Sequence, residues 1–178
     1  MTNRVLKEVK EWVLSILVAA VIAFIIKGFL IDVIQVSGPS MLPVLSDKDR
    51  LVIEKISLYT KNYERGEIII FKPNEEVNDI YIKRIIGLPG DKVEIRDGLV
   101  YVNNEKIDEN YLSPDTYTRS NPEREDFSSL IVPDNCLYVL GDNRTISEDS
   151  RYIGPIPIEN VKGHALFRVY PFDQLKKF

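Results

Sequence analysis

The chain divides into two parts by the pattern of its apolar positions. Residues 12–31, "WVLSILVAAVIAFIIKGFLI", are apolar apart from Ser15 and Lys27, whereas the remainder has only short apolar or alternating stretches. The long run approaches the ~20 residues that an α-helix needs to cross a bilayer. Basic residues occur among positions 1–11, and the positive-inside rule then places that end in the cytoplasm. We therefore predict one transmembrane anchor at 12–31, with residues 32–178 on the extracytoplasmic side of the cell membrane.

Two other interpretations of this run are weaker. A cleaved signal peptide has the same basic start and apolar core, but here the small residues lie inside the core and no A-x-A cleavage site follows. A buried core helix usually has a polar face, which the run lacks. The pattern thus favours an uncleaved anchor.

From Asp32 onward the apolar positions indicate strands rather than helices. The predicted strands are Val33–Val36, Arg50–Lys55, Glu67–Phe71, Asp79–Ile86, Lys92–Arg96, Leu99–Val102, Leu130–Val132, Leu137–Leu140 and Ala165–Tyr170. Asp97-Gly98 and Asn103-Asn104 are typical of tight hairpin turns. Many short strands with few helical stretches predict a mainly β fold, an antiparallel barrel or sandwich-like domain. The polar segment 108–127 is predicted to be a small exposed insertion rather than a linker.

Composition narrows the class of protein. Hydrophobic residues make up 44% and charged residues 28% of the 178 residues, as in a globular domain. The net charge of -4 argues against nucleic acid as a partner. The one cysteine, Cys136, cannot form an internal disulfide, and the one histidine, His164, lies in an apolar strand where a structural role is expected. We therefore expect chemistry without histidine, a metal or an organic cofactor.

A turn soon after the apolar run carries the first candidate for chemistry. "VSGPSMLPVL", residues 36–45, sets Gly38, Pro39 and Pro43 around Ser40. Glycine and proline turn and stiffen the chain, but a turn that only connects two elements has no need of the hydroxyl. Most serines beside glycine and proline are turn formers, so Ser40 needs a base from elsewhere to become a nucleophile.

Lys83 is the candidate base because "DIYIKRIIGLPGD" places it in the most apolar strand after the anchor. Strand alternation puts Tyr81, Lys83 and Ile85 on one face. Apolar neighbours disfavour the charged ammonium, so the lysine pKa should fall toward the range in which a neutral amine accepts a proton. The alternative is an edge-strand lysine that protects against aggregation.

The third cluster is the loop "GDNRTISEDSRYIG", residues 141–154. Its acids and arginines favour internal ion pairs and carboxylate-capped turns, which make a loop rigid. A rigid loop here would present Ser147 to the lysine amine. A surface loop can be this polar for solubility alone, so the cluster gains weight only together with the other two stretches.

These stretches resemble the signature motifs of the type I signal peptidases, the membrane-anchored Ser/Lys proteases that remove signal peptides from exported proteins. "SGPSMLP", "YIKRIIGLPGD" and "GDNRTISEDSR" follow the order of that family, and the anchor and the closing "FRVYPF" extend the resemblance to nearly the whole chain. The single anchor and compact insertion are similar to the Gram-positive type. The resemblance implies Ser40 as the nucleophile, Lys83 as the general base and Ser147 as the residue that orients the amine.

The resemblance also implies supporting roles for a set of charged residues, with Asp149–Arg84 or Asp149–Arg151 as the ion pair. The set is Asp142, Arg144, Asp149, Arg151 and Arg84. Some family members have a serine at the position of Gly38, so the oxyanion here would depend more on the Ser40 backbone N–H. Val44 replaces a threonine common in the family, which alters packing and leaves the chemistry untouched.

The substrates implied are signal-peptide-bearing preproteins cleaved after small residues, typically Ala-X-Ala. An extended peptide would add as a strand beside "DVIQV" and "DIYIK" and place alternate side chains in shallow apolar pockets. The expected lining residues are Ile34, Val36, Met41, Tyr81 and Ile82. The lipid bilayer is the other expected partner, with the protein export machinery nearby.

Two other functions stay open at this point. Soluble self-cleaving repressors are related Ser/Lys proteases, but they would carry a DNA-binding module where this chain has an anchor. An inactive, membrane-tethered binder of exported peptides is the second alternative. The presence of Ser40, Lys83 and Ser147 together argues against it.

Overall fold

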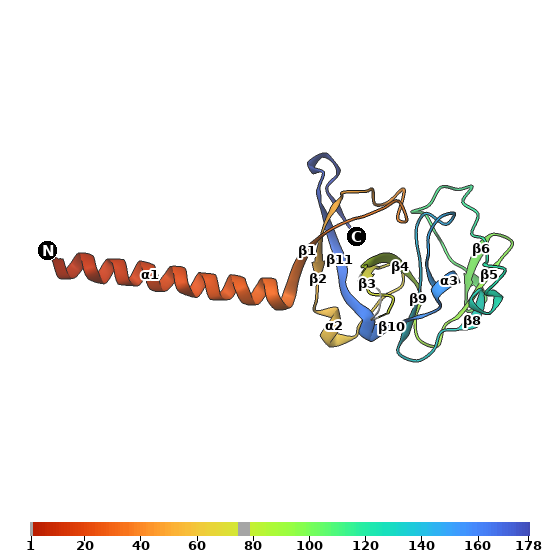
Figure 1. The fold of residues 1–178 in the computed structure, drawn as a ribbon, viewed down its shortest axis with the longest axis horizontal. Coiled ribbons are helices and arrows are strands. Elements are labelled where there is room, and N and C mark those ends of the chain that lie inside the picture. Colours follow the sequence, from red (N-terminus) through yellow and green to blue (C-terminus); the bar gives the residue numbers. More distant parts are fainter. Residues whose placement is uncertain (1, 75–78) are drawn as a thin grey trace.

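The computed structural model describes residues 2–74 and 79–178 (Figure 1). The apolar run forms helix α1 (Thr2–Ile25), which is followed directly by the π-helix η1 (Ile26–Leu30). In Figure 1, α1 projects away from the strands of the rest of the chain.

The helical stretch Lys7–Leu30 is long and apolar enough to cross a membrane. The most apolar 18 consecutive residues in it have a mean hydropathy of 2.7, and none of them is buried inside the protein. The predicted span, 12–31, lies within this stretch except for Ile31, which begins the first strand. The crossing itself and its orientation stay predictions.

The strands of the remaining described chain form two antiparallel sheets. The larger has eight strands in the order β1-β2-β11-β3-β4-β9-β10, with β12 paired to β11. These strands are β1 (Ile31–Gln35), β2 (Arg50–Glu54), β3 (Ile68–Phe71), β4 (Tyr81–Gly87), β9 (Cys136–Leu140), β10 (Ile156–Pro157), β11 (Val161–Tyr170) and β12 (Lys176–Lys177). The smaller sheet, in the order β7-β6-β5-β8, contains β5 (Lys92–Arg96), β6 (Leu99–Val102), β7 (Glu105–Lys106) and β8 (Ser129–Ile131). The predicted mainly β, antiparallel fold is confirmed.

Short helical turns connect the strands. They are α2 (Ser57–Thr60), α3 (Ser150–Ile153) and the 3₁₀ turns η2 (Glu125–Phe127), η3 (Ile158–Asn160) and η4 (Phe172–Gln174). These turns, like the two-residue strands β7, β10 and β12, are too short to leave a periodic pattern in the sequence, and none of them was predicted.

The two predicted hairpin turns form as expected. Asp97 and Gly98 have φ values of 51° and 78°, and they join β5 to β6. Asn103 and Asn104, with φ values of 54° and 69°, join β6 to β7. Positive φ at both central positions is the geometry that two-residue hairpins need, and Asn, Asp and Gly adopt it most easily.

The core explains why β3 reads "IIIF" rather than alternating with polar residues. Ile68 and Ile70 belong to one apolar cluster, and Ile69 and Phe71 belong to another. Because neighbouring residues of a strand point to opposite faces, β3 is buried on both sides. The same holds for the middle of the neighbouring strand β4. Any polar group in these strands is therefore withdrawn from water.

His164 lies on β11, where its Nδ1 is 3.6 Å from Glu54 Oε1 and 3.8 Å from Glu67 Oε1. It therefore has carboxylate neighbours within the large sheet, in line with the structural role expected for it. Cys136 is a free, half-buried thiol at the start of β9.

Candidate active site

Ser40 and Lys83 meet, although 43 residues separate them in the chain. Lys83 Nζ donates a hydrogen bond of 2.9 Å to Ser40 Oγ. Ser40 lies in the turn that follows β1, and Lys83 lies in the first half of β4. The structure thus brings together the two residues for which the sequence predicted nucleophilic and basic roles.

The turn that carries Ser40 is fixed at both ends. Gly38 has φ of +86°, a left-handed conformation that favours glycine, and its N–H donates to Asp47 Oδ1 at 3.0 Å. Beyond the serine, Met41 and Leu45 are fully buried, and the Leu45 N–H donates to the Met41 carbonyl at 2.8 Å. The buried side chains of Met41 and Leu45 and the left-handed conformation of Gly38 hold the Ser40 hydroxyl at the surface of the core.

Lys83 is only 4% exposed, because β4 runs between β3 and β9 in the large sheet. Burial lowers the pKa of Lys83 from 10.5 to about 8, since an ammonium loses its hydration there. Arg151 lowers the pKa further, whereas the carboxylates of Asp149, Glu148 and Asp142 oppose the shift. The Tyr81 ring centroid lies 5.2 Å from Nζ, so the aromatic neighbour expected from the sequence is present.

The loop after β9 is held by a buried ion pair between Asp149 and Arg151. Arg151 Nε donates to Asp149 Oδ1 and Nη2 donates to Oδ2, each at 2.8 Å. Asp149 also caps α3 and accepts the Gly141 N–H at 3.0 Å. Of the two ion pairs left open by the sequence, Asp149–Arg151 is therefore the one that forms.

Arg84 pairs with Asp142 instead. Its Nε and Nη2 donate to the two Asp142 oxygens at 2.8 and 2.6 Å, and its Nη1 donates to the Gly66 carbonyl at 2.7 Å. The register Arg84↔Leu140 between β4 and β9 explains this choice. It sets Arg84 beside the end of β9, two residues before Asp142.

Ser147 lies deep in the same loop, but its Oγ makes no hydrogen bond to Lys83. Its Oγ is buried and has no hydrogen-bond partner among the described residues. A methyl group built on Gly141 would collide with Ser147 Oγ and would lie 2.6 Å from the Ser40 carbonyl oxygen. Gly141 is thus packed between the two serines, and the orienting role of Ser147 stays a prediction.

A groove of about 700 Å³ opens beside Ser40 and Lys83. All five predicted lining residues border it: Ile34, Val36, Met41, Tyr81 and Ile82. Val36, Met41 and Ile82 are buried, so they form its floor. Sequence reasoning missed the polar and exposed part of the lining, which consists of Gln35, Ser37, Asp79, Ile80, Ile146 and Glu148.

Comparison with known proteins decides the family. A protein-family model described as "Signal peptidase, peptidase S26" matches residues 9–170. The chain belongs to this signal peptidase family. The resemblance found in the sequence motifs is thereby confirmed, together with the expected enzyme class, a signal peptidase I.

Individual signal peptidases resemble the chain over most of its length. It is 37% identical to "Signal peptidase IB" of Staphylococcus aureus strain COL, covering 96% of this chain and 94% of that protein. It is 40% identical to "Probable signal peptidase I-2" of Synechocystis, covering 90% of this chain and 73% of that one. A crystal structure of a signal peptidase I from Enterococcus faecalis V583 is 38% identical, with a TM-score of 0.49 over 57% of this chain and 95% of that one.

Two residues of this signal peptidase at the site were not singled out from the sequence. The Asn143 side-chain amide donates to the Pro39 carbonyl at 3.2 Å, and Gly141 is packed against both serines. Both stand in the motif "GDNR", whose charged members alone received roles. A glycine directly before a carboxylate in a motif was the available signal for a close backbone approach.

Proposed function

We propose that the chain is a membrane-bound endopeptidase that removes signal peptides from preproteins after Ala-X-Ala-like sites, using Ser40 and Lys83 as a catalytic dyad. The observation that carries the proposal is the 2.9 Å hydrogen bond between Lys83 Nζ and Ser40 Oγ, with the lysine 4% exposed. A buried amine beside a hydroxyl is the arrangement that activates serine without histidine.

The reaction needs Lys83 in its neutral form. The amine takes the Ser40 proton as Oγ attacks the scissile carbonyl, and an oxyanion forms. The resulting ammonium then donates a proton to the leaving amine, which departs as the mature protein's N-terminus. A water molecule, deprotonated by the neutral amine, next attacks the acyl-enzyme and releases the signal peptide. The Lys83 ammonium then returns its proton to Ser40 Oγ, which restores the neutral amine and the serine hydroxyl.

The oxyanion is assigned to the Ser40 backbone N–H and the Gly38 region. None of the described residues accepts a hydrogen bond from the Ser40 N–H, so this donor is available to a substrate oxygen. A donor aimed at developing negative charge stabilises the transition state more than the ground state. Ser147 is assigned the role of holding the neutral amine, and its buried, unpartnered Oγ supports this.

Substrate choice follows from the groove. β1 pairs with β2 on one side only among the described strands, so its other edge offers main-chain groups to an extended peptide. Alternate side chains of that peptide would meet the buried floor of Val36, Met41 and Ile82. Because these residues are packed into the core, the pockets cannot deepen, and large side chains are rejected by overpacking.

The lipid bilayer is proposed as the second partner. Besides the apolar helix, Phe172 is 79% and Leu175 is 63% exposed in the connection between β11 and β12. The connection follows Tyr170, which lies in line with Arg50 and Gln35, at the end of β1 opposite η1. In Figure 1 it projects on the side of the domain from which α1 extends. Apolar side chains there would enter the interface while the anchor crosses with its N-terminus in the cytoplasm. A site near the membrane would meet preproteins as the export machinery releases them.

The test compares wild type, Ser40→Ala and Lys83→Ala on a preprotein with an Ala-X-Ala site, in detergent micelles or vesicles. We expect cleavage by wild type alone, and unchanged cleavage with a chelator present. Full activity in either variant would remove the dyad. A wild type that binds the peptide without cleaving it would instead favour an inactive binder.

A further inference from the structure

The polar segment 108–127 reaches back toward the proposed active site. Glu109 Oε1 accepts a hydrogen bond of 2.9 Å from the Tyr111 hydroxyl, and it also accepts one from Arg144 Nη2. The Arg144 side chain is 0% and the Glu109 side chain is 16% exposed. This ion pair is therefore withdrawn from water, unlike a typical surface pair, and it links the segment to the loop after β9.

Arg144 also contacts the backbone of the loop after β9, and so connects that loop to Glu109. Its Nε donates to the Gly141 carbonyl at 3.0 Å, and its Nη1 donates to Thr118 Oγ1 at 2.7 Å. All three guanidinium nitrogens thus have partners, two of them in the segment 108–127. Gly141 is the residue packed between Ser40 and Ser147. The position of Arg144 therefore affects how Gly141 packs against the two serines.

Tyr111 makes a second link, to the strand that carries Lys83. The Arg84 Cζ atom lies 3.9 Å from the centroid of the Tyr111 ring. Arg84 is the neighbour of Lys83 in β4, and it forms the ion pair with Asp142. The ring therefore stacks on the guanidinium that joins β4 to the loop after β9.

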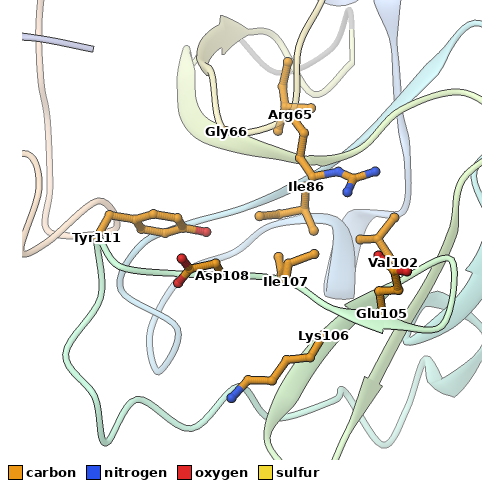
Figure 2. Close-up of a pocket in the computed structure, with 10 residues that line it drawn as sticks. Arg65, Gly66, Ile86, Val102, Glu105, Lys106, Ile107, Asp108 and Tyr111 are labelled. Atoms are coloured by element: carbon orange, nitrogen blue, oxygen red, sulfur yellow. The ribbon is translucent and has the colours of Figure 1, made fainter.

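A cavity of about 270 Å³ lies beside this ring (Figure 2). Tyr111 and Asp108 border it from the segment, and Ile85 and Ile86 border it from β4. Close packing alone therefore does not hold the ring over Arg84, because there is space next to it. The Tyr111 hydroxyl tethers the ring on the side of the ion pairs, because it donates to Glu109 and accepts a hydrogen bond of 3.3 Å from Arg144 Nη2.

We propose that Glu109 and Tyr111 are positioning residues for catalysis, which hold Arg144 and Arg84 and, through them, the loop and strand that carry Ser147 and Lys83. The inference rests on the proposed dyad and gives a function to the insertion 108–127. Neither residue touches Ser40 or Lys83, so their effect must pass through the two arginines.

The midpoint of the pH profile separates positioning from a purely structural role. The charged groups that act on Lys83 are Asp149, Glu148 and Asp142 of the loop, with Arg151 of α3. Glu109 is not one of them. If the loop loosens when Glu109 is changed, water reaches the amine and its pKa rises toward the ordinary value. A residue that only adds stability would change the melting temperature and leave this midpoint in place.

The experiment uses the full chain in detergent micelles with a signal-peptide substrate, and it measures kcat, KM and melting temperature at several pH values. The variants are Glu109→Gln, Tyr111→Phe, Tyr111→Leu and, as a matched control, Glu123→Gln, whose glutamate is exposed in the same segment. We expect Glu109→Gln to lower kcat about tenfold, the loss typical of a weakened buried charged hydrogen bond. The pH midpoint of this variant should move upward by roughly half a unit or more.

The tyrosine variants separate the hydroxyl contacts, with Glu109 and with Arg144 Nη2 at 3.3 Å, from the ring contact with Arg84. Tyr111→Phe keeps the ring on Arg84 and should lose less activity than Tyr111→Leu, which loses the ring contact as well. Wild-type kcat and pH midpoint in Glu109→Gln and Tyr111→Leu would overturn the proposal, and so would a lower kcat at an unchanged midpoint. Full activity of Lys83→Ala in the same assay would instead contradict the proposed dyad of Ser40 and Lys83. A failure of the dyad and a failure of the positioning role therefore give different results.

Discussion

The backbone N–H of Asn143 donates a hydrogen bond of 2.9 Å to the carbonyl oxygen of Ser40. This contact joins the loop after β9 to the turn after β1 through main-chain atoms alone. The loop and the turn are therefore joined independently of the side-chain hydrogen bond between Ser40 and Lys83. Substitutions that push the two backbones apart should impair the site even where Ser40 and Lys83 are intact.

Gly141→Ala is the most direct way to separate them. The added methyl group would collide with Ser147 Oγ and lie 2.6 Å from the Ser40 carbonyl oxygen, so one of the two segments must move. We expect kcat/KM to fall about 100-fold, as for a displacement of roughly 1 Å in an active site. The measurement is peptide cleavage, with circular dichroism to establish that the variant is folded.

Gly28→Ala is the control for that substitution. A methyl group at Gly28 has no atom within 4 Å, so activity should equal that of wild type. Wild-type activity in Gly141→Ala would show that the two segments can separate without harm.

Cleavage should depend on pH through Lys83. Its pKa is lowered to about 8 by burial, and the neutral amine is the form that accepts the Ser40 proton. We expect kcat/KM to rise about tenfold per pH unit on the acidic side and to level off above the pKa. Steady-state assays over the range in which the protein stays folded would measure this profile. A rate that is constant down to acidic pH would contradict the assignment of the base.

Lys83→Met should stabilise the fold near neutral pH while it removes activity. The folded-state pKa of about 8 is below the ordinary lysine value of 10.5, so the unfolded chain binds more protons between these values. Wild-type stability therefore rises with pH across that window, and below it the buried ammonium destabilises the fold in full. From ~1.4 kcal/mol per pKa unit, we expect Lys83→Met to raise the free energy of unfolding by about 1–3 kcal/mol at pH 7.

Urea unfolding at pH 7 and near pH 10 would measure the difference between Lys83→Met and wild type. The advantage of the variant should shrink at the higher pH. An advantage independent of pH would attribute the gain to packing rather than to the removed charge.

Local patterns were sufficient to predict the parts of the fold that depend on local chemistry. The apolar helix, the hairpin turns at Asp97-Gly98 and Asn103-Asn104, and the apolar surroundings of Lys83 all follow from the residues within a few positions of each. The five lining residues of the groove were predictable because they lie within a few positions of Ser40 or Lys83, in the two stretches that were expected to border an extended peptide.

Long-range pairing was not predictable in the same way. The sequence left Arg84 and Arg151 as alternative partners of Asp149, and the register of β4 against β9 sets Arg84 beside Asp142 instead. The contacts of Arg144 with Glu109 and Thr118 join positions 35 and 26 residues apart through an irregular segment. A segment without periodicity gives no register, so its contacts cannot be read from the sequence.

The buried ion pair between Asp149 and Arg151 should behave as a coupled unit in unfolding experiments. Asp149→Asn leaves the buried Arg151 guanidinium without its counterion, and Arg151→Met leaves the Asp149 carboxylate in the same state. We expect each to lower the free energy of unfolding by about 3–5 kcal/mol, because an unpaired buried charge is costly. The double variant should lose less stability than the sum of the two single losses. In both variants that lack Arg151, the carbonyls of Arg119 and Arg144 also lose their hydrogen-bond donor.

The exposed pair of Arg124 and Asp126, at 3.5 Å, provides the comparison. Asp126→Asn should change the free energy of unfolding by less than about 1 kcal/mol, since solvent screens that pair. Denaturant titration of all four variants measures these differences. If the Asp149 and Arg151 losses were additive, the two side chains would contribute independently, and the loop would owe its rigidity to the carbonyl contacts of Arg151 instead.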